Sequence, residues 1–99
     1  MPLVTIGPGK FRKTEFPPPG RRKIEIEMEA TGAVDVFLVD VRDYDKWRSG
    51  RSYTGASFLR RRTLNARIES DKPQDDWYLI FENHSPEEVT VHYEVYTVP

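Results

Sequence analysis

The chain has 99 residues, enough for one domain with a modest core, so we expect residues 1–99 to form a single domain. Its 15 Lys and Arg residues nearly balance its 16 Asp and Glu residues, and the net charge of -1 excludes a general attraction to nucleic acid or anionic lipid. The absence of cysteine excludes disulfides and thiolate chemistry. Because no long apolar run marks a signal peptide or a membrane span, we expect a soluble cytoplasmic protein without a membrane partner.

Residues 1–20 form a proline-rich start that we expect to be extended. Weak strands are predicted at Leu3–Ile6 and at Phe11–Phe16. The three prolines of the segment FPPPG at 16–20 have no backbone N–H to donate, so this segment cannot pair as a central strand. We expect it to be an extended connector that ends in a turn.

The clearest strand is RKIEIEMEAT at 22–31, where apolar and charged residues alternate as in a strand with one solvated face. A turn is predicted at Thr31–Ala33. The next segment, VDVFLVDV at 34–41, has apolar residues on both faces, which indicates a central strand.

An aromatic and basic loop, DYDKWRSGRSY at 43–53, follows the central strand. Asp43 is predicted to cap one helical turn that carries Tyr44 and Trp47 and ends at Gly50, and helix is expected to be nearly absent elsewhere. Guanidinium groups beside aromatic rings suit anionic or planar ligands. The alternative is that the aromatic residues cover an open end of the fold while the arginines pair with acidic neighbours. The candidate binding residues are Tyr44, Trp47, Arg48, Arg51, Tyr53, Arg60 and Arg62.

Weaker strands are also predicted at Ser57–Thr63 and Leu64–Ser70, around the run LRRRT at 59–63. Arginines at consecutive positions point to opposite faces of a strand, so protection of an edge strand by charge is the simpler interpretation. Phosphate or nucleic-acid binding is the alternative, and the near-zero net charge argues against it. We therefore expect no nucleic-acid partner.

The C-terminal part contains two strong strands, DWYLIFE at 76–82 and EVTVHYEVYTV at 88–98, joined by the short loop NHSPEE. This spacing predicts a hairpin. With the earlier segments it gives seven or eight short strands, which favours an all-β, antiparallel and jelly-roll-like β-sandwich. The predicted core residues are Ile26, Met28, Val36, Leu38, Val39, Leu79, Phe81, Val91 and Tyr93.

Motifs for metal binding and catalysis are weak. Asp40, Asp43 and Asp45 lie close in sequence, but the loop lacks the glycine and the closing glutamate of a calcium loop. His84 and His92 have no suitably spaced partners, and they are expected on the surface. No serine lies in a nucleophile motif. We therefore expect no metal, no cofactor and no enzyme activity.

The stretch from Val36 to Asn83 resembles the central part of a bacterial family of uncharacterised β-sandwich domains, some of which are joined to TIR domains. The most specific piece is RSGRSY at 48–53, followed by the late strand that begins WYL. More distantly, the stretch is similar to Golgi-dynamics and pre-peptidase C-terminal domains. The resemblance implies a sandwich used for interaction, with no enzyme activity of its own.

These observations favour two candidate functions. The first is a non-catalytic interaction module for protein contact or self-association, acting beside an effector domain. The alternative is a domain that binds a small or anionic ligand, including carbohydrate, through the loop at 43–53. A pocket lined by Trp47, Arg48 and Arg51 would favour the ligand, whereas a flat or convex surface there would favour a protein partner.

Overall fold

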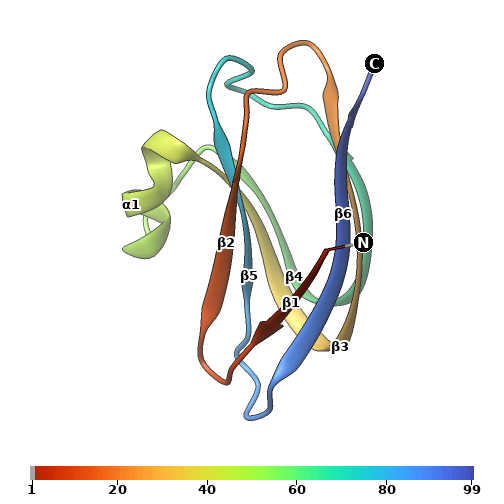
Figure 1. Cartoon of the computed structure of the whole chain (residues 1–99). Helices are drawn as coiled ribbons and strands as arrows, with labels where there is room; N and C mark the ends of the chain where they lie inside the picture. Colours follow the sequence, from red (N-terminus) through yellow and green to blue (C-terminus); the bar gives the residue numbers. More distant parts are fainter. Residues whose placement is uncertain (1) are drawn as a thin grey trace.

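The computed structural model describes residues 2–99, and in this part of the chain six antiparallel strands form one sheet that curls on itself (Figure 1). The prediction of an all-β fold with one short helical segment is confirmed. The described part contains no helix long and apolar enough to cross a membrane. The elements are β1 (Leu3–Ile6), β2 (Phe11–Phe16), β3 (Lys23–Asp40), the 3-10 turn η1 (Val41–Asp43), α1 (Tyr44–Arg48), β4 (Gly55–Ile68), β5 (Trp77–Glu82) and β6 (Val89–Val98).

Strand β3 is the centre of the sheet and pairs with three other strands. Its first half, Lys23–Ala30, pairs with β6, and its second half, Asp35–Asp40, pairs with β5. Strand β4 runs beside both halves on the other edge. Beyond these pairs, β1 joins β6 and β2 joins β5. The halves of β3 therefore belong to two layers, one with β6 and β1 and the other with β5 and β2 (Figure 1).

The turn predicted at Thr31–Ala33 is wrong, because these residues lie inside β3, which continues for 18 residues. The pairing of β3 with β4 changes register between Glu29 and Val34, as happens where an irregularity bends a strand without ending it. Gly32 permits close packing at this bend, since a Cβ there would lie 3.1 Å from Cγ2 of Val89. The Thr-Gly signal thus marks the place where β3 changes layer.

The two weak strands predicted around LRRRT are also one continuous strand, β4. Its irregularity includes Arg60, which has a positive φ of 56°. The two mergers, in β3 and in β4, explain why six strands form in place of the seven or eight predicted. Within the described residues β4 pairs with β3 alone, so the arginine run does lie on an edge strand.

The predicted hairpin between β5 and β6 is wrong, because each of these strands pairs with a different half of β3. The loop between them crosses from one layer to the other and is anchored by Asn83, which is fully buried. Its side-chain amide donates to the carbonyl oxygens of Ile6, Gly7 and Glu87 at 3.0, 3.3 and 2.7 Å. These bonds satisfy a buried polar group at the crossing point.

The main core lies between the two layers. Of the nine residues predicted for the core, eight are buried, and Tyr93 is partly buried against them. Val39 is buried on the other side of β3, because alternation turns it away from Leu38. Ile80 of β5 is likewise fully buried but separate from the main core. A second apolar surface therefore exists on the outside of the sheet, where α1 lies (Figure 1).

Candidate functional site

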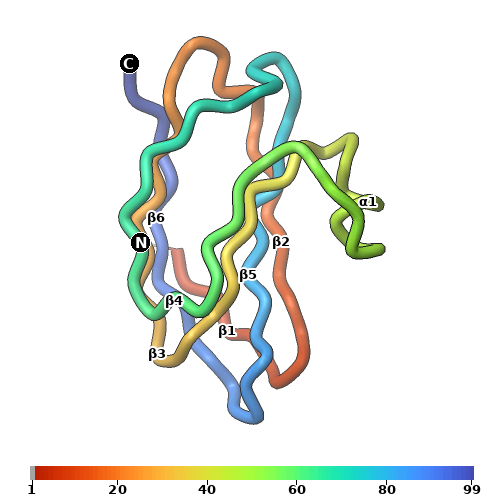
Figure 2. The backbone as a smooth tube through the Cα atoms, turned by 180° about the vertical axis from the view of Figure 1, so that it is seen from behind, coloured from red at the N-terminus to blue at the C-terminus, as the bar shows by residue number. Residues whose placement is uncertain are grey.

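Helix α1 projects from the end of β3 and lies beside the layer that contains β2 and β5 (Figure 2). Asp43 immediately precedes the helix, as predicted, but its side chain makes no capping bond. Its Oδ2 accepts a hydrogen bond from the backbone N–H of Thr54 at 2.7 Å, which lowers the pKa of Asp43. Asp40 instead caps η1 by accepting from the N–H of Arg42 at 2.9 Å. The Asp43 carboxylate thus ties together the two ends of the loop at 43–53.

The aromatic residues of α1 pack on the outer face of the sheet. The Trp47 ring lies edge-on to Phe11 and Phe37, with centroid distances of 5.3 and 5.4 Å. Tyr44 stacks against Trp47 at 5.8 Å and meets the edge of Tyr78 at 5.3 Å. Trp47 therefore covers an outer sheet face, and the idea that it covers an open end of the fold is wrong. The reason is that the outer face of β3 and β5 is itself apolar.

Basic side chains border this aromatic cluster. Lys13 Nζ lies 4.0 Å from the ring centroid of Tyr44, and Arg48 Cζ lies 5.1 Å from that of Phe11, both within cation–π range. Arg51 Nε donates to Ser49 Oγ at 2.9 Å. Arg48 and Arg51 are exposed, as predicted, and neither forms an ion pair with an acidic residue in the part of the chain described. Their positive charges therefore face solvent.

Trp47, Arg48 and Arg51 border an open groove of about 510 Å³, a size within the range of small-molecule sites. Burial raises the pKa of Tyr53, consistent with its position against the sheet. Four predicted residues, Trp47, Arg48, Arg51 and Tyr53, line the groove together. The full lining is Gly9, Phe11, Phe37, Trp47, Arg48, Gly50, Arg51, Tyr53 and Glu82.

The other predicted residues lie elsewhere. Tyr44 supports Trp47 and is not part of the groove lining. Arg60 lines a neighbouring cavity, and Arg62 Nη2 donates to the carbonyl oxygen of Thr31 at the bend of β3. Phe11, Phe37 and Glu82 also line the groove, and no motif in the sequence indicated them. Alternation could have placed Phe37 outward, but only the pairing of β2 with β5 brings Phe11 opposite Glu82.

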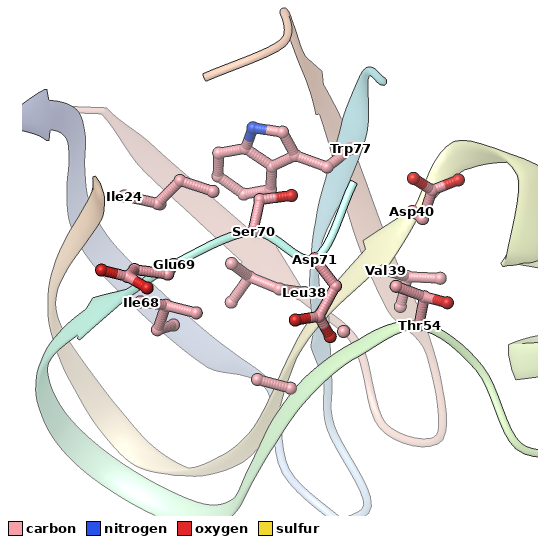
Figure 3. A pocket seen from close by; sticks show the side chains of 12 residues that line it. Ile24, Leu38, Val39, Asp40, Thr54, Ile68, Glu69, Ser70, Asp71 and Trp77 are labelled. Atoms are coloured by element: carbon pink, nitrogen blue, oxygen red, sulfur yellow. The ribbon is translucent and has the colours of Figure 1, made fainter. Parts of the chain in front are cut away.

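A second cavity lies at one end of the main core, between Trp77 and the two ends of β4 (Figure 3). Its volume is about 40 Å³, which is room for roughly one water molecule. Asp40 lies at its border, and burial is the main cause that raises the pKa of this carboxyl, followed by the carboxylate of Asp75. A cavity of this size does not accommodate an organic ligand, so the groove is the stronger candidate site.

No family model matches the chain, and no curated protein matches it. Among solved structures, the chain is similar to a solution NMR structure of a de novo designed double-stranded beta-helix. The TM-score is 0.56 and the sequence identity 14%, and the match covers 96% of each chain. The resemblance to domains joined to TIR domains stays a prediction. Identity this low shows the fold alone, and the chain therefore has an all-β fold similar to that of the designed protein.

Proposed function

We propose that this chain is a non-catalytic binding module whose groove beside α1 holds an anionic ligand with a planar apolar part. The observation that carries the proposal is that Trp47, Arg48 and Arg51 line one concave surface. A flat or convex surface at this loop would have favoured a protein partner. A cytoplasmic location and a role beside an effector domain belong to the same proposal, and the lack of cysteine supports the location.

The groove offers different chemistry on its two sides. Aromatic rings from the sheet and from α1 form one wall, which suits a flat apolar group. The guanidinium groups of Arg48 and Arg51 can donate paired hydrogen bonds to a carboxylate or phosphate. Glu82 also lines the groove, and its negative charge would direct an anionic group toward the arginines. The arrangement therefore favours one orientation of the ligand.

Contact with a protein partner, including a second copy of the chain, is the second candidate. The free edge of β4 supports it, because the 14 residues of this strand pair on one side alone within residues 2–99. Leu59 on this edge is 57% exposed. The arginines at 60–62 oppose direct pairing of two β4 edges, since like charges would meet. We therefore place this function behind ligand binding.

The test uses 1-naphthyl phosphate as the anionic probe and 1-naphthol as its neutral counterpart. Titrations followed by backbone amide NMR should shift signals of the groove residues. The Arg48→Ala, Arg51→Ala double variant should bind the phosphate roughly tenfold more weakly or worse, because it loses charge-assisted hydrogen bonds. Folding should be retained, since both side chains are exposed.

The matched control is the Arg21→Ala, Arg61→Ala double variant, which changes the net charge equally at two other exposed arginines. It should bind as tightly as the wild type. Equal affinity for the phosphate and the naphthol, or equal affinity of the two double variants, would contradict anion binding in the groove. Absence of binding in a chain that sediments as a dimer would favour the second candidate.

A further inference from the structure

Three side chains meet on the outer face of the sheet, next to the groove. Asp35 of β3 and Glu82 of β5 lie directly opposite one another in the strand register. His84, two residues after Glu82, places its Nε2 at 2.7 Å from Glu82 Oε1 and 3.2 Å from Asp35 Oδ2. One atom from each side chain lies within 4.8 Å of the other two. The cluster thus combines one imidazole with two carboxylates.

The two carboxylates need a positive partner, because like charges directly opposite in a sheet are destabilising. The side chains of Asp35 and Glu82 are 15% and 27% exposed, so water screens their repulsion only in part. Within residues 2–99, neither forms an ion pair with a lysine or arginine. His84 can carry at most one positive charge, which cannot neutralise two negative charges. A divalent cation would neutralise both.

We propose that Asp35, Glu82 and His84 bind a divalent transition-metal ion of the zinc class. Two atoms that each bind a tetrahedral zinc ion at about 2.1 Å lie roughly 3.4 Å apart. The observed 3.2 Å between His84 and Asp35 is close to this separation, and the 2.7 Å to Glu82 opens with a small rotation of a flexible side chain. An imidazole ligand favours zinc over calcium and magnesium, which prefer oxygen.

Hydrogen bonds from neighbouring residues hold these ligands in position. Asp35 Oδ1 accepts from the backbone N–H of Arg60 at 2.9 Å, which leaves Oδ2 directed at His84. The residue before His84 is the buried Asn83, and Ser85 Oγ donates to Asn83 Oδ1 at 2.7 Å. Such supporting hydrogen bonds orient metal ligands and raise affinity. The ligands thus come from two paired strands and an anchored loop.

Space next to the cluster allows a ligand besides the protein. A cavity of about 320 Å³ is lined by Asp35, Glu82, His84 and Arg60, together with the exposed Leu59. Three protein ligands leave one position of a tetrahedral ion open, and this cavity would hold the water or small anion that completes it. Glu82 borders both this site and the proposed anion groove, so a bound ion would remove the negative charge by which Glu82 directs an anionic ligand in the groove.

The test is calorimetric titration of protein without an affinity tag with zinc chloride alone. We expect one ion per chain and an increase in the melting temperature of the wild type on adding zinc. His84→Ala should weaken zinc binding by roughly tenfold or more and abolish this increase. The variant should fold, as circular dichroism can verify, because the His84 side chain is 66% exposed. Glu82→Gln should weaken binding in the same direction.

The matched control is His92→Ala, which removes the other histidine, an exposed residue of β6 in the opposite layer. It should bind zinc as the wild type does. Absence of zinc binding, unchanged binding in His84→Ala, or an equal loss in His92→Ala would overturn the proposal. Binding of calcium or magnesium as tight as that of zinc would overturn the assignment to a transition metal. These titrations contain no anionic probe, so their outcome is distinguishable from failure of the groove.

Discussion

The two outer faces of the curled sheet differ sharply, although strand β3 contributes to both. In its first half the outward residues are glutamates, and Glu25 pairs with Arg67 at 3.2 Å while Glu27 accepts from the hydroxyl of Tyr96 at 3.1 Å. In its second half the outward residues include Phe37 and Val39, and Val39 is fully buried. One layer therefore has a solvated polar face, and the other has a second apolar surface.

This difference explains the position of the aromatic loop. An apolar outer face must be covered, and the segment from η1 to α1 supplies Tyr44 and Trp47 as that cover. The cover is incomplete, because a helix of five residues leaves a groove at its side. The groove and the Asp35, Glu82 and His84 cluster both lie beside this covered face, so the candidate functions gather on one layer.

Substitutions on the two outer faces should lower the stability by very different amounts. Ile80→Ala removes a fully buried side chain beneath the cover and should lower the free energy of unfolding by about 3 kcal/mol. Glu27→Ala changes an outward residue of the polar face and should cost about 0.5 kcal/mol or less. Urea denaturation measures both. Similar losses in the two variants would mean that the outer faces do not differ in their contribution to stability.

A smaller effect is expected when the cover itself is reduced. Trp47 is half-buried, so Trp47→Ala should cost about 2 kcal/mol, below the range for a fully buried tryptophan. For a domain of this size, the melting temperature should fall by roughly 8 °C or more. Arg48→Ala, which changes an exposed neighbour on the same helix, is the control. A Trp47→Ala protein that melts within a degree or two of the wild type would show that the indole does not stabilise the fold.

The smallest effect on stability is expected from the titration of Asp40 and Asp43, the two aspartates that precede η1 and α1. The pKa of Asp40 is raised above 3.8, chiefly by burial, so the folded state holds this proton more tightly than the unfolded chain does. Its contribution to stability is complete below pH 3.8 and is lost as the pH rises through the folded pKa. Asp40→Asn cannot titrate, so its stability relative to the wild type should increase as the pH rises from 3.8 through the folded pKa of Asp40. Urea denaturation across this range measures the change.

The pKa of Asp43 shifts in the opposite direction to that of Asp40, so Asp43 serves as an internal control. Its pKa is lowered below 3.8, first by the hydrogen bond from the Thr54 backbone, so its contribution is present above that pH and is lost as the pH falls through the folded pKa. Asp43→Asn should therefore lose stability relative to the wild type as the pH rises. Parallel trends for the two variants would contradict the opposite shifts of the two carboxyls.

Local alternation in the sequence determined much of this structure. It placed β1 and β2 at their observed bounds and assigned Leu79 and Phe81 to the core, while the helical spacing of Tyr44 and Trp47 after Asp43 located the helical turn. These predictions held because the side-chain period of a strand and the spacing of a helical turn are properties of neighbouring residues. The exposure of Arg48 and Arg51 could be predicted in the same way.

The tertiary structure alone decided which segments meet. The sequence around Gly32 resembles a turn, but pairing with β4 on one side, and with β6 and then β5 on the other, keeps β3 continuous through the bend. The pairing of β2 with β5 brings Phe11 beside Trp47, and the pairing of β3 with β5 brings Asp35 opposite Glu82, although these residues are far apart in the chain. Strand partners and register depend on burying apolar area between distant segments, and a local pattern does not contain that information.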